Sequence, residues 1–172
     1  MNLNQVIRAI EKTAALQPPI GSIVRNDVFR INASPAVRYG AFAWLQGEHR
    51  TSADGNMMEW SFTFFYVDRL TEDKGNEVAI QSTGIQVLEN ILRNLEEVGV
   101  FSNGDYSFQT FNQRFADECA GVYCRVVLQT AKDTLCPEAW EFLETDGSFN
   151  LGYNEDFHCW EWVTEERTIY FI

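Results

Sequence analysis

The chain has 172 residues, of which 45% are hydrophobic and 14% aromatic, so it is long enough for one domain with a sizeable core and is not globally disordered. Its formal net charge of −12 argues against general nucleic-acid binding, which needs cations to displace the counterions of phosphate. The sequence has neither the roughly 18 consecutive apolar residues of a membrane helix nor the apolar core of a signal peptide. We therefore expect a protein that is made and kept in a cytoplasm.

The N-terminal segment predicts a helix. Apolar residues recur at helical spacing across residues 3–16, with Asn2 or Asn4 as the cap and the Pro-Pro pair at 18–19 as the stop. Residues 20–38 hold short extended pieces, which predict a loop or an edge strand.

A hairpin follows the N-terminal segment. Residues 39–50 predict a strand, residues 51–59 a long connection with an Asp-Gly turn, and residues 59–67 the returning antiparallel strand. The second strand alternates strictly, which gives it one strongly aromatic face. That face consists of Trp60, Phe62, Phe64 and Tyr66.

A polar connection, residues 68–77, leads from this strand to a long amphipathic helix that ends at Gly99. Gly84 is costly inside a helix, so it marks either a late start or close packing. The apolar stripe of the helix consists of Ile80, Gly84, Val87, Leu88, Ile91, Leu95 and Val98.

The remaining elements are shorter. Phe108, Phe111 and Phe115 indicate a short extended or helical segment, and residues 121–130 predict another strand. We expect an α+β fold in which an antiparallel sheet of about four to six strands packs against two main helices.

The chain changes character after Cys136-Pro137. Basic residues become scarce, and short strands are expected near 157–163 and 168–172. We therefore divide the chain into an α+β core domain, residues 1–137, and an acidic, aromatic-rich, β-rich C-terminal extension, residues 138–172, packed on the core.

Charge is distributed unevenly along the chain. Residues 1–50 hold six basic and three acidic residues, whereas residues 138–172 hold nine acidic residues and one basic residue. Such polarity permits the basic end of one copy to meet the acidic end of the next. The alternative is a solvated acidic surface that keeps the chain soluble.

Catalytic chemistry is poorly represented in the sequence. His49 ends a strand, and His158 and Cys159 are neighbours whose side chains would point to opposite faces of a strand. Metal-binding, phosphate-binding and hydrolase motifs are missing, and Cys124 fits a small buried hydrophobe. We expect no enzyme, no cofactor and no metal, with a Cys/His enzyme as the least favoured alternative.

The C-terminal aromatic residues leave a further alternative open. Trp140, Trp160 and Trp162 belong to a region that is crowded with aromatic side chains. Tryptophan is favoured at protein and carbohydrate interfaces because it buries a large area and keeps a polar handle. These residues predict either a satellite core or a non-enzymatic protein- or carbohydrate-binding surface.

Three segments carry a resemblance to a known class of proteins: FFYVDRLTEDKGNEVAIQSTGIQVLENIL, FNQRFADECAGVYCRVVLQT and the Cys136-Pro137 break. Together with the order of elements, they resemble the head–tail joining, tail-completion and neck-ring proteins of tailed bacteriophages, especially crAss-like phages and related prophages. The resemblance covers residues 1–137 and consists of a pattern rather than of catalytic residues.

This resemblance implies a tail-terminator-like subunit that assembles into a sixfold or twelvefold ring around the DNA channel between portal and tail. It also implies assembly in the host cytoplasm, residence in the neck or tail of the virion, and contacts with portal, neck or tail proteins. DNA would pass through without sequence-specific binding, and no membrane would be involved.

Two connections are candidates for subunit contacts: the long loop at 51–59, with its two methionines, and the charged turn at 68–77. Basic residues of the N-terminal third complete the set. The candidate subunit-interface residues are Arg25, Arg30, Arg38, Met57, Met58, Arg69, Glu72, Asp73 and Lys74.

Overall fold

The computed structural model describes residues 1–28, 30–33, 36–112, 118–131, 151–154, 159–163 and 168–171. The helices are α1 (Leu3–Ala15), α2 (Arg30–Ala33) and α3 (Glu77–Glu97). The strands are β1 (Ser22–Arg25), β2 (Ala41–Thr51), β3 (Met57–Arg69), β4 (Phe101–Ser102), β5 (Phe108–Asn112), β6 (Cys119–Ala131), β7 (Leu151–Asn154), β8 (Cys159–Val163) and β9 (Thr168–Phe171).

One mixed sheet contains all of these strands, in the order β4-β6-β3-β2-β1-β9-β8-β7, with β5 also paired to β6. The α+β class with two main helices is confirmed, but the expected antiparallel sheet is wrong in one respect. Strand β1 runs parallel to both β2 and β9. The chain crosses back from the end of β1 through α2 before β2 begins, and such a crossover makes consecutive strands parallel.

Strand β1 also departs from expectation because it has a neighbour on each side and is not an edge strand. Strands β8 and β9 occupy the expected stretches near 157–163 and 168–172. Most of the residues between β6 and β7 lie outside the described residues, so the division of the chain at residue 137 stays a prediction.

The hairpin of β2 and β3 is antiparallel, as expected, but its connection is shorter than expected. Thr51 pairs with Met58, so the loop comprises residues 52–56 only. Met57 and Met58 therefore lie in β3, where they are held by pairing with β6 at Ala131 and Thr130. The loop is shorter because β6 is long enough to pair with β3 as far as Met57. This pairing extends β3 beyond the alternating pattern seen in its sequence.

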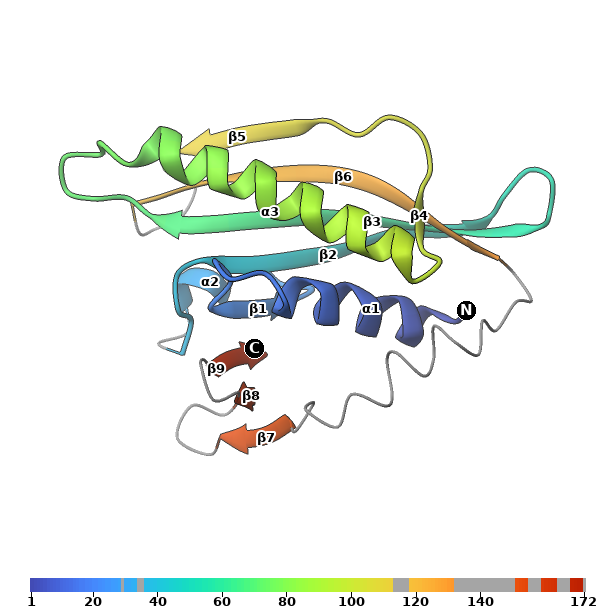
Figure 1. Ribbon diagram of the computed structural model, residues 1–172, viewed down its shortest axis with the longest axis horizontal. Helices are drawn as coiled ribbons and strands as arrows, with labels where there is room; N and C mark the ends of the chain where they lie inside the picture. The colour runs from blue at the N-terminus through green and yellow to red at the C-terminus, as the bar shows by residue number, and fades with distance from the viewer. Residues whose placement is uncertain are drawn as a thin grey trace.

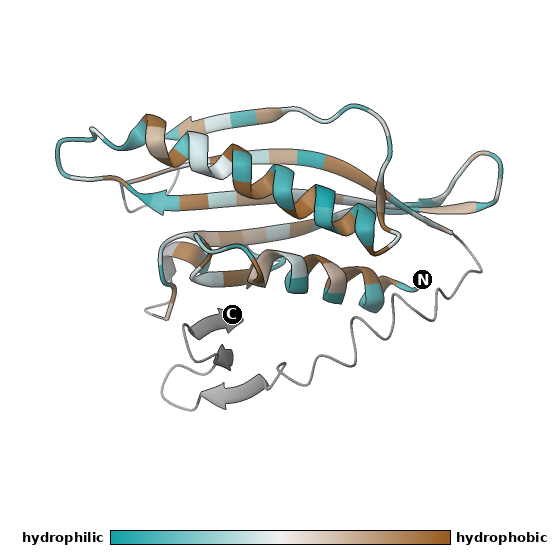
Figure 2. Ribbon diagram, viewed as in Figure 1, coloured by the Kyte–Doolittle hydropathy of each residue, from teal (hydrophilic) through white to brown (hydrophobic). Residues whose placement is uncertain are grey.

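Helices α1 and α3 cover one face of the sheet (Figure 1). The aromatic face predicted for β3 is buried beneath them, and Phe42 and Trp44 of β2 join it. Figure 2 shows α3 banded in hydrophobic and hydrophilic colours, as expected for a helix with one face on a sheet. The predicted stripe of α3, from Ile80 to Val98, is buried throughout.

The ends of both helices are defined by local hydrogen bonds. Asn2 caps α1 through a capping box with Gln5, so of the two expected caps Asn2 is the one used. At the end of α3, Gly99 adopts a φ of 79° and Val100 N–H donates to the Leu95 carbonyl at 2.9 Å. This arrangement is a Schellman motif, and it turns the chain directly into β4.

Gly84 marks close packing and not a late start, because α3 begins at Glu77. A Cβ at this position would lie 2.9 Å from Tyr66 Cδ1 and 3.0 Å from Val122 Cγ2. Glycine therefore lets the helix lie directly on β3 and β6.

Among the described residues, α2 and the segments that flank it cover one end of the opposite face of the sheet. The buried members of this second cluster are Val24, Val28, Ile31, Ala41, Ala43, Val67, Phe111 and Cys119. Among the described helices, none has the length and apolar character needed to span a bilayer.

The packing at Gly84 gives a testable prediction. Replacing Gly84 with Ala should lower the free energy of unfolding by about 1–2 kcal/mol, because the clash with the buried Tyr66 ring outweighs the better helix propensity of Ala. The matched control is Ser82→Ala on the exposed side of α3, which should be neutral or slightly stabilising. Urea denaturation measures both variants, and a Gly84→Ala protein as stable as the parent would contradict the close packing.

Candidate functional site

Among the described residues, no helix covers most of the side of β2, β3 and β6 that faces away from α1 and α3. We call this side the open face. Strand side chains alternate, so residues between the buried aromatics of β3 point to this side. The cross-strand register places Thr63 beside Arg125 and Leu45, and Phe65 beside Tyr123. The open face consists of Leu45, Ser61, Thr63, Phe65, Tyr123, Arg125 and Val127, all half-buried or exposed.

Two irregularities interrupt the sheet at the same place. In β2, Gln46 pairs with Phe62 and His49 with Trp60, so Gly47 and Glu48 both stand opposite Ser61 as a β-bulge. At the edge of the sheet beyond β6, Ser102 of β4 pairs with Leu128, whereas Phe108 of β5 pairs with Cys124. Asn103 N–H still donates to the Val127 carbonyl of β6 at 2.7 Å, and residues 104–107 then bow away because they face a shorter stretch of that strand.

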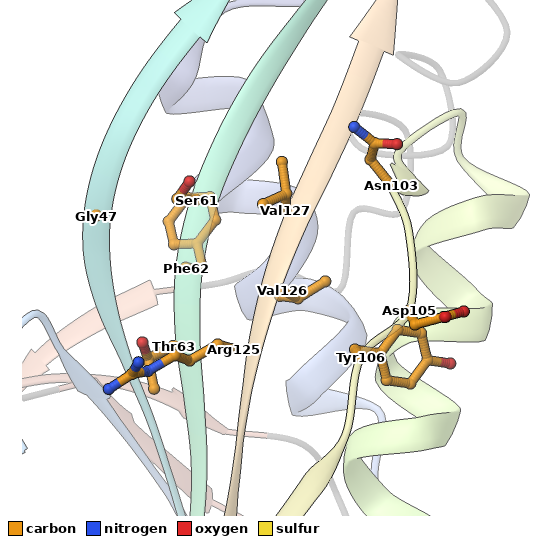
Figure 3. Close-up of a pocket in the computed structure, with 10 residues that line it drawn as sticks. All are labelled: Gly47, Ser61, Phe62, Thr63, Asn103, Asp105, Tyr106, Arg125, Val126 and Val127. Carbon is orange, nitrogen blue, oxygen red and sulfur yellow. The ribbon is translucent and has the colours of Figure 1, made fainter.

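A hollow of about 350 Å³ lies between these two irregularities (Figure 3). The strands contribute small or polar groups to it, namely Gly47, Ser61 and Thr63. The loop before β5 contributes Asn103, Asp105 and Tyr106 from beyond β6. Val126 and Val127 of β6 line it as well, so the hollow combines polar groups with an apolar wall.

Arg125 is the cation of the hollow. In Figure 3 its side chain extends beside Thr63 and away from Asp105. The guanidinium is exposed, and within the described part of the chain no acidic group forms a salt bridge with it. An arginine fork without a partner is suited to a carboxylate, which it can bind through two parallel hydrogen bonds.

A buried carboxylate closes the hairpin end of the open face. Glu59 is 5% exposed and accepts hydrogen bonds from Arg50 Nε at 2.6 Å, Asn103 Nδ2 at 2.9 Å and Gln129 Nε2 at 3.1 Å. The hydrogen bond from Arg50, followed by that from Gln129, lowers the pKa of Glu59. This network joins β2, β3 and β6 to the loop that borders the hollow, and it fixes that border.

Aromatic rings lie at the end of the open face that is far from the hairpin loop. The Phe65 and Tyr123 rings stack with centroids 5.7 Å apart, and Phe111 packs against Tyr123 at 6.4 Å. Tyr123 donates a hydrogen bond to Gln109 on β5. The open face therefore changes along the strands from an ionic network, through the hollow, to an aromatic surface.

The basic candidates for subunit contacts have different surroundings. Arg25 binds Glu11 of α1 through Nε at 2.6 Å and Nη2 at 2.7 Å. Arg30 and Arg38 are exposed, and the Arg69 guanidinium lies over the Tyr39 ring at 5.4 Å. Arg25 thus holds α1 to β1, whereas the other three remain on the surface.

The charged turn after β3 is exposed and internally braced. Asp73 accepts hydrogen bonds from the Thr71 hydroxyl at 2.6 Å and the Gly75 N–H at 3.1 Å, and these bonds lower its pKa. Lys74 Nζ forms a salt bridge with Glu118 Oε1 at 3.4 Å. Glu72 is exposed beside them. The turn therefore presents its charges in a defined arrangement.

The structure does not bring all the candidate residues together. Met57 and Met58 begin β3, whereas Arg69 ends it, at the far end of a strand of 13 residues. The sequence interpretation also missed Arg125, Ser61 and Thr63. Their signal was the alternation in β3 and β6, which places a cation and two hydroxyls on the side opposite the aromatic residues.

The candidate catalytic groups lie elsewhere. His49 is on the helix-covered side, where its ring packs against Trp60 at 5.3 Å, and its buried Nδ1 has no hydrogen-bond partner among the described residues. Burial raises the pKa of the Cys124 thiol to about 12, which keeps it protonated. His158 lies outside the described residues, and the side chain of Cys159 is not described, so that pair stays untested.

The described residues give only partial information on metal binding and on sugar binding. The described residues contain no cluster of three or more His, Cys, Asp or Glu side chains that could hold a metal ion. Trp160 and Trp162 lie in β8, but their side chains are not described, and Trp140 lies outside the described residues. A binding role for these tryptophans stays a prediction.

Sequence comparisons add no relative to this picture: no protein-family model matches the chain, and no curated protein is significantly similar to it. The open face is the candidate functional site on geometric grounds, because it holds the hollow and an arginine without a salt bridge to any described residue.

The Glu59 network gives a prediction about pH. Its folded-state pKa lies below the usual 4.5, so its stabilising contribution is present above pH 4.5 and is lost as pH falls through the folded-state value. The difference in free energy of unfolding between the parent and Glu59→Gln should therefore be largest near neutral pH and shrink in acid. Urea titrations from about pH 7 to about pH 3 measure it. A difference that stayed constant with pH would contradict the proposed network.

Proposed function

We propose that this chain is a structural virion protein of a tailed bacteriophage that forms a ring in the neck or head–tail connection around the DNA channel. The observation that carries the proposal is that the described helices cover the two faces of the sheet to different extents. One face is buried under α1 and α3, whereas the open face presents half-buried apolar side chains and an arginine that has no salt bridge within the described part of the chain. Such a surface is suited to association.

The chemistry of the open face supports a binding role over a catalytic one. Arg125 has hydroxyl and amide neighbours, and His49 and Cys124 point to the other side of the sheet. Cys119 is buried in the cluster beneath the α2 end and does not line the hollow. A nucleophile and a general base would have to lie within hydrogen-bond reach of each other. The polar groups of the hollow can instead bind a charged partner and fix its orientation.

The charge of the chain supports a role beside DNA without binding to it. A net charge of −12 repels phosphate, so a channel lined by such subunits would let a genome pass without adhering to it. The proposed partners are further copies of this chain and portal, neck or tail proteins. The chain would assemble in the host cytoplasm and reside in the virion.

A sixfold or twelvefold ring requires a heterologous contact, in which two different surfaces of the subunit meet and the rotation closes. The open face is one candidate surface. Exposed Arg30, Arg38 and Arg69, and the braced turn at residues 72–74, are further surfaces that could meet neighbouring proteins.

Native mass spectrometry of the full chain over a series of concentrations, with negative-stain electron microscopy, tests this proposal. We expect closed species of six or twelve copies, since heterologous contacts that close give a fixed number of subunits. The same measurement after addition of glycans checks the binding-module alternative. A chain that stayed monomeric at every concentration would contradict the proposal, and glycan binding by that monomer would favour the binding-module alternative.

A further inference from the structure

The outer side of α3 is acidic and lies across the sheet from Arg125. Glu89, Glu96 and Glu97 are exposed there. The only base on this side of the helix among the described residues is Arg93, which donates a hydrogen bond to Asn90 at 2.7 Å. Glu96 accepts a hydrogen bond from the Ser102 hydroxyl at 3.3 Å, and no salt bridge involves any of the three glutamates within the described part of the chain. The molecule thus carries an available cation on one side of the sheet and available carboxylates on the other.

We propose that the hollow beside Arg125 receives a glutamate of the outer side of α3 from a second copy of this chain. This inference rests on the proposed function as an assembly subunit and names the two surfaces that meet. The helix of one copy then covers the open face of the next, as α1 and α3 cover the other face within each copy.

The chemistry of the hollow fits a carboxylate. The Arg125 guanidinium supplies charge and two parallel N–H donors, and the hydroxyls of Ser61 and Thr63 can donate to the same group. Gly47 has no side chain, and a Cβ there would lie only 3.1 Å from Ser61 Cβ, so glycine permits the close approach of the β2 bulge to β3. Arg125 itself is exposed, so a long acidic side chain can reach the cation without displacing the strands.

Apolar surroundings add to the contact. Leu45, Phe65, Tyr123 and Val127 are only half-buried around the hollow, so a covering helix would remove apolar area from water. Excluding water also strengthens the attraction between guanidinium and carboxylate. The charged pair then selects the partner surface, and the apolar rim contributes area.

The position of the two surfaces determines the symmetry of the contact. Arg125 and the glutamates of α3 lie on opposite sides of the sheet, so one copy cannot satisfy both through a twofold pairing of identical patches. The contact is heterologous and passes from copy to copy until it closes. Pairing two open faces would instead bring two Arg125 cations together.

Sedimentation velocity of the full chain at low ionic strength tests the inference. Arg125→Glu should weaken self-association by about tenfold or more, because it places like charges in the contact. Arg8→Glu is the matched control: it makes the same charge change at an exposed position of α1 and should associate like the parent.

A charge exchange separates a lost contact from a lost fold. Glu89→Arg with Glu96→Arg should also weaken association, and combining both changes with Arg125→Glu in one chain should restore it. Circular dichroism checks that each variant folds. The inference is overturned if Arg125→Glu associates like the parent, or if the combined variant stays as weak as the single ones.

The two proposals fail in different ways. If the parent forms rings and Arg125→Glu forms the same rings, the contact is wrong and the proposed function stands. If the parent stays monomeric at every concentration, both the contact and the self-assembling function are wrong.

Discussion

Gly84 lets α3 approach the sheet until the helix backbone lies against Tyr66 and Val122, and the rest of the fold depends on that approach. A Cβ would come within 2.9 Å of the Tyr66 ring, so any larger residue would lift the helix from the aromatic surface. The same tyrosine is crowded from β6, where a Cβ at Gly121 would lie 2.0 Å from the Tyr66 carbonyl oxygen. Two glycines thus permit close approach at Tyr66, Gly84 to its ring from α3 and Gly121 to its backbone carbonyl from β6.

Concentrating both long helices on one face leaves the other face with little to cover it. Helix α2 has one turn and protects only the end near Phe111 and Val67. The bulge at Gly47 and the bowed loop at 104–107 border a hollow on this face. Arg125 is exposed there and has no salt bridge within the described part of the chain, so any surface that covered it would have to supply a partner for its charge.

Periodicity predicted the parts of the fold that are local in sequence. The alternation from Trp60 to Tyr66 and the stripe from Ile80 to Val98 each identify one element and the face that it buries. The parallel pairing of β1 could not be predicted in this way, because it depends on where the chain goes after α2. The site was missed for a related reason: Arg125, Ser61 and Gly47 come from three strands, and only the register and the bulge place them together.

Hydroxyl-radical footprinting of dilute and concentrated protein tests the central claim, that the open face is the surface through which copies associate. Tyr123 and Phe65 lie on the open face, and Tyr66 is buried beneath α3, so each sample contains its own internal reference. The account predicts that oxidation of Tyr123 and Phe65 falls as the chain associates, while Tyr66 stays protected at both concentrations. Equal oxidation of Tyr123 and Phe65 in the monomer and in the assembly would contradict it.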